Sequence, residues 1–245
     1  MMSLGGIMEK YIKDIVFKDN KDLYNELIKL SEDIKKTSFK TKPFLIEFIG
    51  TCRSGKSTSI DLIQDVLIKN GLKVLVVDEE YVKLTKEINY DRNKKMNIDS
   101  LDYTNNIIEE KITIYDKTCY ENYDVIIYDR GINDEFIWLN VFGASSSATN
   151  EYDEKLKERK INLLIIMTCS VETTLKRKYL NSLSVMPSKW TNSDVMTKYL
   201  ESLNKTNKYF NNHSNFICKI NTDDKDKVNV ALEICKEIIK YRGEL

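Results

Sequence analysis

Residues 44–68 read FLIEFIG (44–50), TCRSGKST (51–58) and SIDLIQDVLI (59–68), and this stretch decides the fold. An apolar strand-like run, a loop bounded by glycines and a segment with apolar residues at helical spacing follow in the order of a phosphate-binding P-loop. Glycines 50 and 55 permit backbone dihedrals that let successive N–H groups surround a phosphate at the start of a helix. The alternative is a glycine turn that joins a strand to a helix without binding a ligand.

The P-loop pattern predicts roles for individual side chains. Lys56 is expected to reach the β- and γ-phosphates of a nucleotide, and the Ser57 hydroxyl is expected to bind Mg²⁺, with Thr58 as the weaker substitute. The expected nucleotide-binding residues are Gly50, Arg53, Ser54, Gly55, Lys56, Ser57 and Thr58. The predicted cofactors are therefore ATP and Mg²⁺.

Apolar runs elsewhere in the chain predict four more strands. The five predicted strands span residues 44–49, 73–77, 125–128, 161–167 and 216–220, and helical patterns separate them. This alternation predicts an α/β fold of three layers, with a five-stranded parallel sheet and helices on both faces. Helices are expected at 103–121, 151–160, 171–180, 194–211 and 228–241, and a loop of small residues at 143–150. The segment 83–100 is either helix or loop.

The chain is expected to form one P-loop domain with an N-terminal extension. Residues 1–42 are expected to comprise a leader and an amphipathic helix, and residues 43–245 the domain itself. A lid segment is expected near residues 176–192.

Charged residues follow the second and third predicted strands, and ligands bind beyond the carboxyl ends of strands in open parallel sheets. Asp129 is expected to bind Mg²⁺ or to accept a proton from the attacking hydroxyl, and Arg130 to bind a substrate phosphate. The alternatives are that Asp129 caps the next helix and that Arg130 pairs with a surface acid. Asp78, Glu79 and Glu80 are either substrate-binding groups or an ordinary acidic turn.

A basic cluster precedes the predicted lid segment. Phosphotransferases can bring a cation from a lid to neutralise charge on the transferred phosphoryl group, and Arg177 is a candidate for that role. A solvated basic face is the alternative, and it is the preferred interpretation for Lys176 and Lys178. The predicted catalytic residues are Lys56, Asp129, Arg130 and Arg177.

The composition limits the partners of the chain. The 38 basic and 38 acidic residues cancel, which argues against nucleic acid or a membrane surface as a partner. No apolar run approaches the ~20 residues that span a bilayer, and the five cysteines lack the spacing of a disulfide or zinc framework. We therefore expect a soluble cytoplasmic protein that binds ATP and a small-molecule acceptor, with a homodimer left open.

Cys52 lies in the P-loop. It is either an oxidation-sensitive thiol or a small residue that fits the loop.

Taken together, these motifs resemble the thymidylate kinase and deoxynucleoside kinase branch of P-loop kinases. The resemblance rests on EFIG at the end of the first strand, GTCRSGKST, the acids at 78–80, YDRG at 128–131 and the basic helix before the lid. It spans about residues 43–240 and implies Mg-ATP as the phosphoryl donor, with Glu79 or a neighbour near the acceptor. Gly131 departs from the aromatic residue typical of thymidylate kinases, and Asp129 from the glutamate typical of deoxynucleoside kinases.

Three functions follow from this sequence. The first is transfer of the γ-phosphoryl group of ATP to a nucleoside, a nucleoside monophosphate or a similar small acceptor. The second is a kinase of a non-nucleotide acceptor such as an antibiotic or a sugar-like metabolite. The third is a nucleotide-binding ATPase or switch protein.

His213 is expected to end a helix without a catalytic role, and Trp138 and Trp190 either pack in the core or stack on a base.

Overall fold

The computed structural model of the chain describes residues 21–38, 43–69, 71–78, 101–180 and 193–243. The predicted substrate-binding residues Glu79 and Glu80 lie outside these ranges, as do Trp190, the segment 83–100 and the larger part of the predicted lid.

The five predicted strands form one parallel sheet in the order β2-β3-β1-β4-β5. The strands are β1 (Phe44–Gly50), β2 (Val74–Val77), β3 (Val125–Asp129), β4 (Ile161–Thr168) and β5 (Ser214–Asn221). The central strand β1 pairs with β3 on one side and with β4 on the other. This order places the P-loop, which follows β1, beside the carboxyl end of β3, where Asp129 lies.

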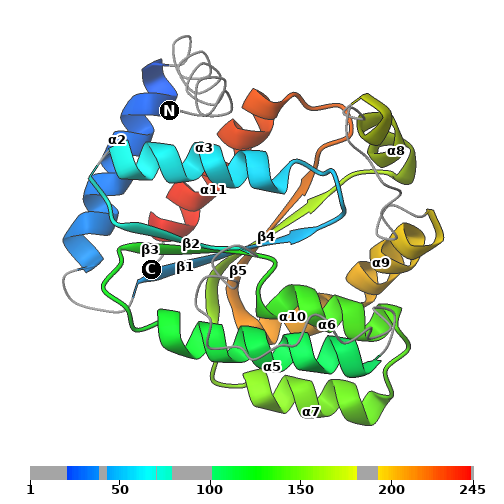
Figure 1. The fold of residues 1–245 in the computed structure, drawn as a ribbon. Helices are drawn as coiled ribbons and strands as arrows, with labels where there is room; N and C mark the ends of the chain where they lie inside the picture. Colours follow the sequence, from blue (N-terminus) through cyan, green and yellow to red (C-terminus); the bar gives the residue numbers. More distant parts are fainter. Residues whose placement is uncertain (1–20, 39–42, 70, 79–100, 181–192, 244–245) are drawn as a thin grey trace, which may run out of the picture.

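Helices cover both faces of the sheet, as Figure 1 shows. On one face, α2 (Lys21–Ser38), α3 (Lys56–Lys69) and α11 (Lys227–Gly243) contact one another. The other face carries α5 (Leu101–Thr118), α6 (Ile132–Val141), α7 (Ser146–Leu156), α9 (Ser193–Lys205) and α10 (Asn207–His213). The remaining helix of the described residues, α8 (Val171–Leu180), follows β4. The predicted three-layer α/β fold is therefore confirmed.

Each face of the sheet has its own apolar core, and β1 contributes to both. Ile46 and Phe48 belong to the cluster on the α3 side, whereas Leu45 and Ile49 belong to the cluster on the α6 side. Because side chains alternate along a strand, Glu47 lies on the same side as Leu45 and Ile49. Its side chain is fully buried. A carboxylate in the middle of a buried strand requires polar partners, and α6 supplies them.

The N-terminal helix α2 is part of the core on the α3 side. Leu30 and Ile34 lie four positions apart, which places them on one face of the helix, and both are buried in the same apolar cluster as Phe48. This face packs α2 against α3 and α11. Within the described residues, no helix is long and apolar enough to cross a membrane.

Two predictions about the helices are wrong. The segment 143–150, predicted as a loop, contains the first residues of α7, because the Ser145 hydroxyl accepts a hydrogen bond from the Ala148 amide and caps the helix. The predicted helix 194–211 is instead two helices that meet at Thr206. His213 ends α10 as predicted, and it is buried with Nε2 2.6 Å from the Asp153 carboxylate.

Candidate active site

The P-loop between β1 and α3 has the backbone conformation that its sequence predicts. Gly50 has a φ of 133° and Gly55 a φ of 94°, both in the region that favours glycine. A Cβ atom on Gly50 would lie 1.8 Å from the carbonyl oxygen of Met167, at the end of β4. The amide of Thr51 donates to that same oxygen at 3.1 Å. The start of the loop is thus packed against β4 so closely that only glycine fits.

Lys56 lies buried inside the curve of the P-loop. Its Nζ donates to the carbonyl oxygens of Gly50 at 3.0 Å and of Thr51 at 2.7 Å. Burial and the charge of Arg130 together lower the pKa of Lys56 to about 8, although the charges of Asp134 and Asp129 oppose the change. The ammonium group is held within the loop at the N-terminus of α3.

Ser57 and Asp129 come together from α3 and β3. The Ser57 Oγ donates to Asp129 Oδ2 at 3.3 Å, whereas Asp129 Oδ1 is buried and has no hydrogen-bond partner among the described residues. Burial raises the pKa of Asp129, although the charges of Lys56 and Arg130 oppose this rise. A serine hydroxyl beside a carboxylate with an unsatisfied oxygen is a donor set that suits Mg²⁺. The residues present therefore fit the predicted metal.

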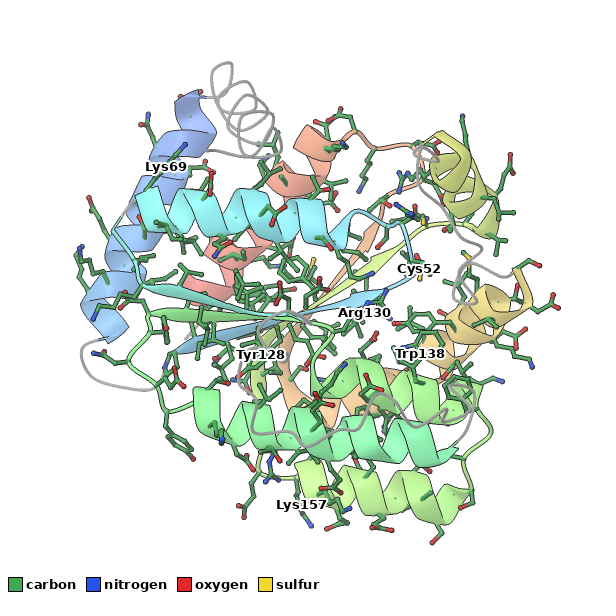
Figure 2. The ribbon with its side chains drawn as sticks, in the orientation of Figure 1. Cys52, Lys69, Tyr128, Arg130, Trp138 and Lys157 are labelled. Atoms are coloured by element: carbon green, nitrogen blue, oxygen red, sulfur yellow. The ribbon has the colours of Figure 1, made fainter. Side chains whose placement is uncertain are left out.

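Arg130 directly follows Asp129 and adopts a left-handed backbone conformation, with a φ of 62°. Its guanidinium lies 3.6 Å from Asp134 Oδ2 and donates to the Cys52 sulfur at 3.7 Å. Asp134 is fully buried, so the partner of Arg130 is not the surface acid of the alternative interpretation. Figure 2 shows Arg130 and Cys52 together at the P-loop end of the sheet. Arg130 thus connects the end of β3 to the P-loop.

Asp134 also connects this region to α9. The Tyr199 hydroxyl donates to Asp134 Oδ1 at 2.5 Å and accepts a hydrogen bond from the Gly50 amide at 3.1 Å. The Trp138 indole donates to Asp134 Oδ2 at 3.1 Å, which places that tryptophan in the core. The first P-loop glycine, Arg130 and α9 are therefore joined through one buried carboxylate.

Arg177 on α8 contacts the backbone of the P-loop and of the segment after β5. Its Nη1 donates to the Arg53 carbonyl oxygen at 3.0 Å and to Thr222 Oγ1 at 3.0 Å, and its Nη2 donates to the Thr222 carbonyl oxygen. These bonds hold together two loops at the carboxyl edge of the sheet. A catalytic role for Arg177 stays a prediction.

The other predicted binding residues line the same edge. Ser54 is buried and donates to the Thr51 carbonyl oxygen at 2.9 Å, whereas Arg53 is exposed and Thr58 half-buried. Asp78 follows the last residue of β2.

Among the charged residues near the site that sequence reasoning missed are Glu47, which is buried, and Lys111, which is half-buried. Glu47 accepts hydrogen bonds from the first turn of α6, and Lys111 on α5 donates to the Arg130 carbonyl oxygen and to the Glu135 carboxylate. A signal for Glu47 exists in the sequence, because an acid within an otherwise apolar strand is unusual. Lys111 has no such signal, since charged residues are common on helices.

All five cysteines are free, and they differ in accessibility. Cys52 is partly exposed, whereas Cys119, Cys169, Cys218 and Cys235 are buried. Cys52 is therefore the thiol in the described residues that a solvent-borne reagent reaches first.

The parallel sheet, the P-loop and the paired serine and aspartate define a P-loop protein of the α/β class. The sequence profile of the AAA domain family matches residues 45–181, more than half of the chain, and the chain belongs to this family. No curated protein matches the sequence.

Two solved structures are similar to the chain. Thymidylate kinase from Ehrlichia chaffeensis is 16% identical, with a TM-score of 0.53 over 82% of this chain and 100% of that one. Deoxyadenosine kinase from M. mycoides with bound dATP is also 16% identical, with a TM-score of 0.47 over 80% of this chain and 98% of that one. The fold predicted from the resemblance to nucleotide kinases is therefore confirmed by the first comparison.

Proposed function

We propose that this protein transfers the γ-phosphoryl group of Mg-ATP to a nucleoside, a nucleoside monophosphate or a similar small acceptor. The observation that carries the proposal is the convergence of three groups at the adjacent ends of β1 and β3. These are the P-loop lysine, the Ser57–Asp129 pair with its unsatisfied carboxylate oxygen, and the Arg130 guanidinium. Phosphoryl transfer depends mainly on positioning and charge neutralisation, and these groups supply both.

The nucleotide side of the reaction belongs to the P-loop. The amides of the loop and Lys56 would bind the β- and γ-phosphates, while Ser57 and Asp129 would hold Mg²⁺. The metal would neutralise charge that develops on the phosphates. Arg177 would support this side by fixing the Arg53 carbonyl.

The acceptor side belongs to the ends of β2 and β3. Arg130 would neutralise charge on the transferred group, and one of the acids at 78–80 would accept the proton of the attacking hydroxyl.

A kinase of a non-nucleotide acceptor is the second candidate, and one observation favours it. Arg130 and Lys111, the described cations on the α5–α6 side of the site, already face the carboxylates of Asp134 and Glu135. Because these cations are already paired, the site suits an acceptor without a phosphate group. A phosphate dianion on the acceptor would have to compete with the buried carboxylates for the same cations.

An ADP-release assay with Mg-ATP tests the proposal against a panel of nucleosides, nucleoside monophosphates and amino-sugar alcohols, with mass spectrometry of the products. We expect a product 80 Da heavier than one class of acceptor, and Lys56→Ala should abolish it. Lys69→Ala is the matched control, because Lys69 lies exposed at the other end of α3 (Figure 2). Release of ADP without any phosphorylated acceptor would favour an ATPase instead.

A further inference from the structure

Glu47 makes an unusual set of contacts for a residue of a central strand. Its Oε1 accepts hydrogen bonds from the backbone amides of Asn133 at 2.9 Å and of Asp134 at 3.2 Å. Its Oε2 accepts one from the Asn133 side-chain amide at 2.8 Å. The carboxylate is fully buried. Glu47 thus joins the middle of β1 to the first turn of α6.

These bonds replace the usual cap of α6. The first amides of a helix have no partner within it, and a side chain at the N-cap position normally accepts from them. The N-cap residue here is Gly131, which has no side chain for this purpose. A Cβ atom at Gly131 would lie 2.9 Å from Glu47 Cδ, so glycine leaves the space that the carboxylate occupies. Glu47 and Gly131 therefore form one unit.

The capped helix begins two residues after Arg130, and β1 holds the turn on both sides of that arginine. Before the turn, the Arg130 amide donates to the Phe48 carbonyl oxygen at 2.9 Å. After the turn, Glu47 holds the amides of Asn133 and Asp134. A left-handed conformation at a residue other than glycine is strained, and it persists only where the surroundings hold it in place.

We propose that Glu47 is a positioning residue of the phosphotransfer site. Glu47 caps α6 and thereby fixes the turn at Arg130. This turn holds the Arg130 guanidinium beside Cys52 in the P-loop. Glu47 acts through this turn and touches no reacting atom. The inference rests on the proposed function for its catalytic consequence, but the position of Arg130 can be measured without any substrate.

The proposal distinguishes two substitutions of similar size. Glu47→Gln keeps the oxygen that accepts both backbone amides, and rotation of the Asn133 side-chain amide would remove the clash between two NH₂ groups. Glu47→Leu removes every acceptor and leaves the first amides of α6 buried without partners. We expect Gln to preserve the position of Arg130 and Leu to release it.

Alkylation of the native protein by iodoacetamide reports this position, because Cys52 is the partly exposed cysteine of the described residues and the Arg130 guanidinium lies 3.7 Å from its sulfur. Peptide mass spectrometry assigns the modified residue. The Arg130→Ala variant gives the alkylation rate of Cys52 without the Arg130 guanidinium beside it. Glu172 is an exposed acid on α8, and Glu172→Gln is the control. We expect Glu47→Leu to react at the rate of Arg130→Ala, at least threefold different from wild type, and Glu47→Gln within twofold of wild type.

Kinetics separate a positioning role from a merely structural one. ADP binding depends on the P-loop, so its Kd should stay within about threefold in Glu47→Leu, while kcat of phosphotransfer falls at least tenfold. Glu47→Gln should restore most of that kcat. An unchanged Cys52 rate in folded Glu47→Leu would overturn the proposal, even if its melting temperature were lower.

Two further outcomes are covered by the same experiment. If Glu47→Leu does not fold, Gly131→Ala displaces the same carboxylate, and a wild-type Cys52 rate in that variant would overturn the proposal. If wild type binds ADP but phosphorylates no acceptor, the proposed function fails, whereas the alkylation rates still decide the role of Glu47.

Discussion

The buried carboxylate of Glu47 should make the stability of the protein depend on pH. Burial and, to a smaller extent, the Asp134 charge raise the pKa of Glu47 from 4.5 to about 7, although the Asn133 side-chain hydrogen bond and the Lys111 charge oppose the rise. Between these two values the folded state binds more protons at this site than the unfolded state does. The free energy of unfolding should therefore fall as pH rises from 4.5 through 7.

The magnitude follows from the difference between the two pKa values. Each pKa unit corresponds to about 1.36 kcal/mol, so ionisation of Glu47 should cost the folded state about 3 kcal/mol by pH 8. Glu47→Gln mimics the protonated form and removes this loss. We expect the two proteins to be equally stable at pH 4.5 and the variant to be more stable by about 3 kcal/mol at pH 8.

Urea unfolding at pH 4.5, 5.5, 6.5, 7.5 and 8 tests this prediction, with wild type and Glu47→Gln measured side by side. In the difference between the two free energies of unfolding, the contributions of all groups that titrate equally in both proteins cancel. A difference that stays flat, or that grows toward acid pH, would refute the reasoning. A carboxylate kept at this cost is consistent with a functional role, since active sites often lower stability.

Other substitutions test the remaining contacts of the site. Tyr199→Phe removes the hydroxyl between Gly50 and Asp134 and should lower the free energy of unfolding by about 1–3 kcal/mol, measured in urea. It should also weaken ADP binding, because the first P-loop glycine loses its support. Arg177→Met should raise the KM for ATP severalfold and leave the KM for the acceptor unchanged. Asp129→Asn should shift the Mg²⁺ dependence of turnover to at least tenfold higher concentration, measured by metal titration after EDTA treatment.

Local patterns in the sequence were sufficient to predict the strands and the P-loop. The five strands are short apolar runs, and the loop has its glycines, lysine and serine at fixed spacing, so neighbouring residues carry the information. The place of Asp129 at the carboxyl end of β3 could be predicted because it comes after four apolar residues. The sheet order then brought it to Ser57.

Contacts between distant residues could not be predicted in this way. Tyr199 contacts a P-loop glycine 149 positions away, and Arg177 contacts the Arg53 carbonyl 124 positions away. Tyr199 does not stand out in its own helix, because tyrosine is common in helices. Arg177 was predicted as a lid cation, and its contact with the P-loop backbone was not predicted. The start of α7 was missed because its small residues resemble a loop, although Ser145 caps it.

Transfer of label from [γ-³²P]ATP tests the central claim most directly. Wild type, Lys56→Ala and Lys69→Ala are incubated with Mg²⁺ and the acceptor panel, and the products are separated from inorganic phosphate. The account predicts that wild type and Lys69→Ala move the label into an organic product, and that Lys56→Ala does not. Label found only in inorganic phosphate, or transfer that survives the loss of Lys56, would contradict it.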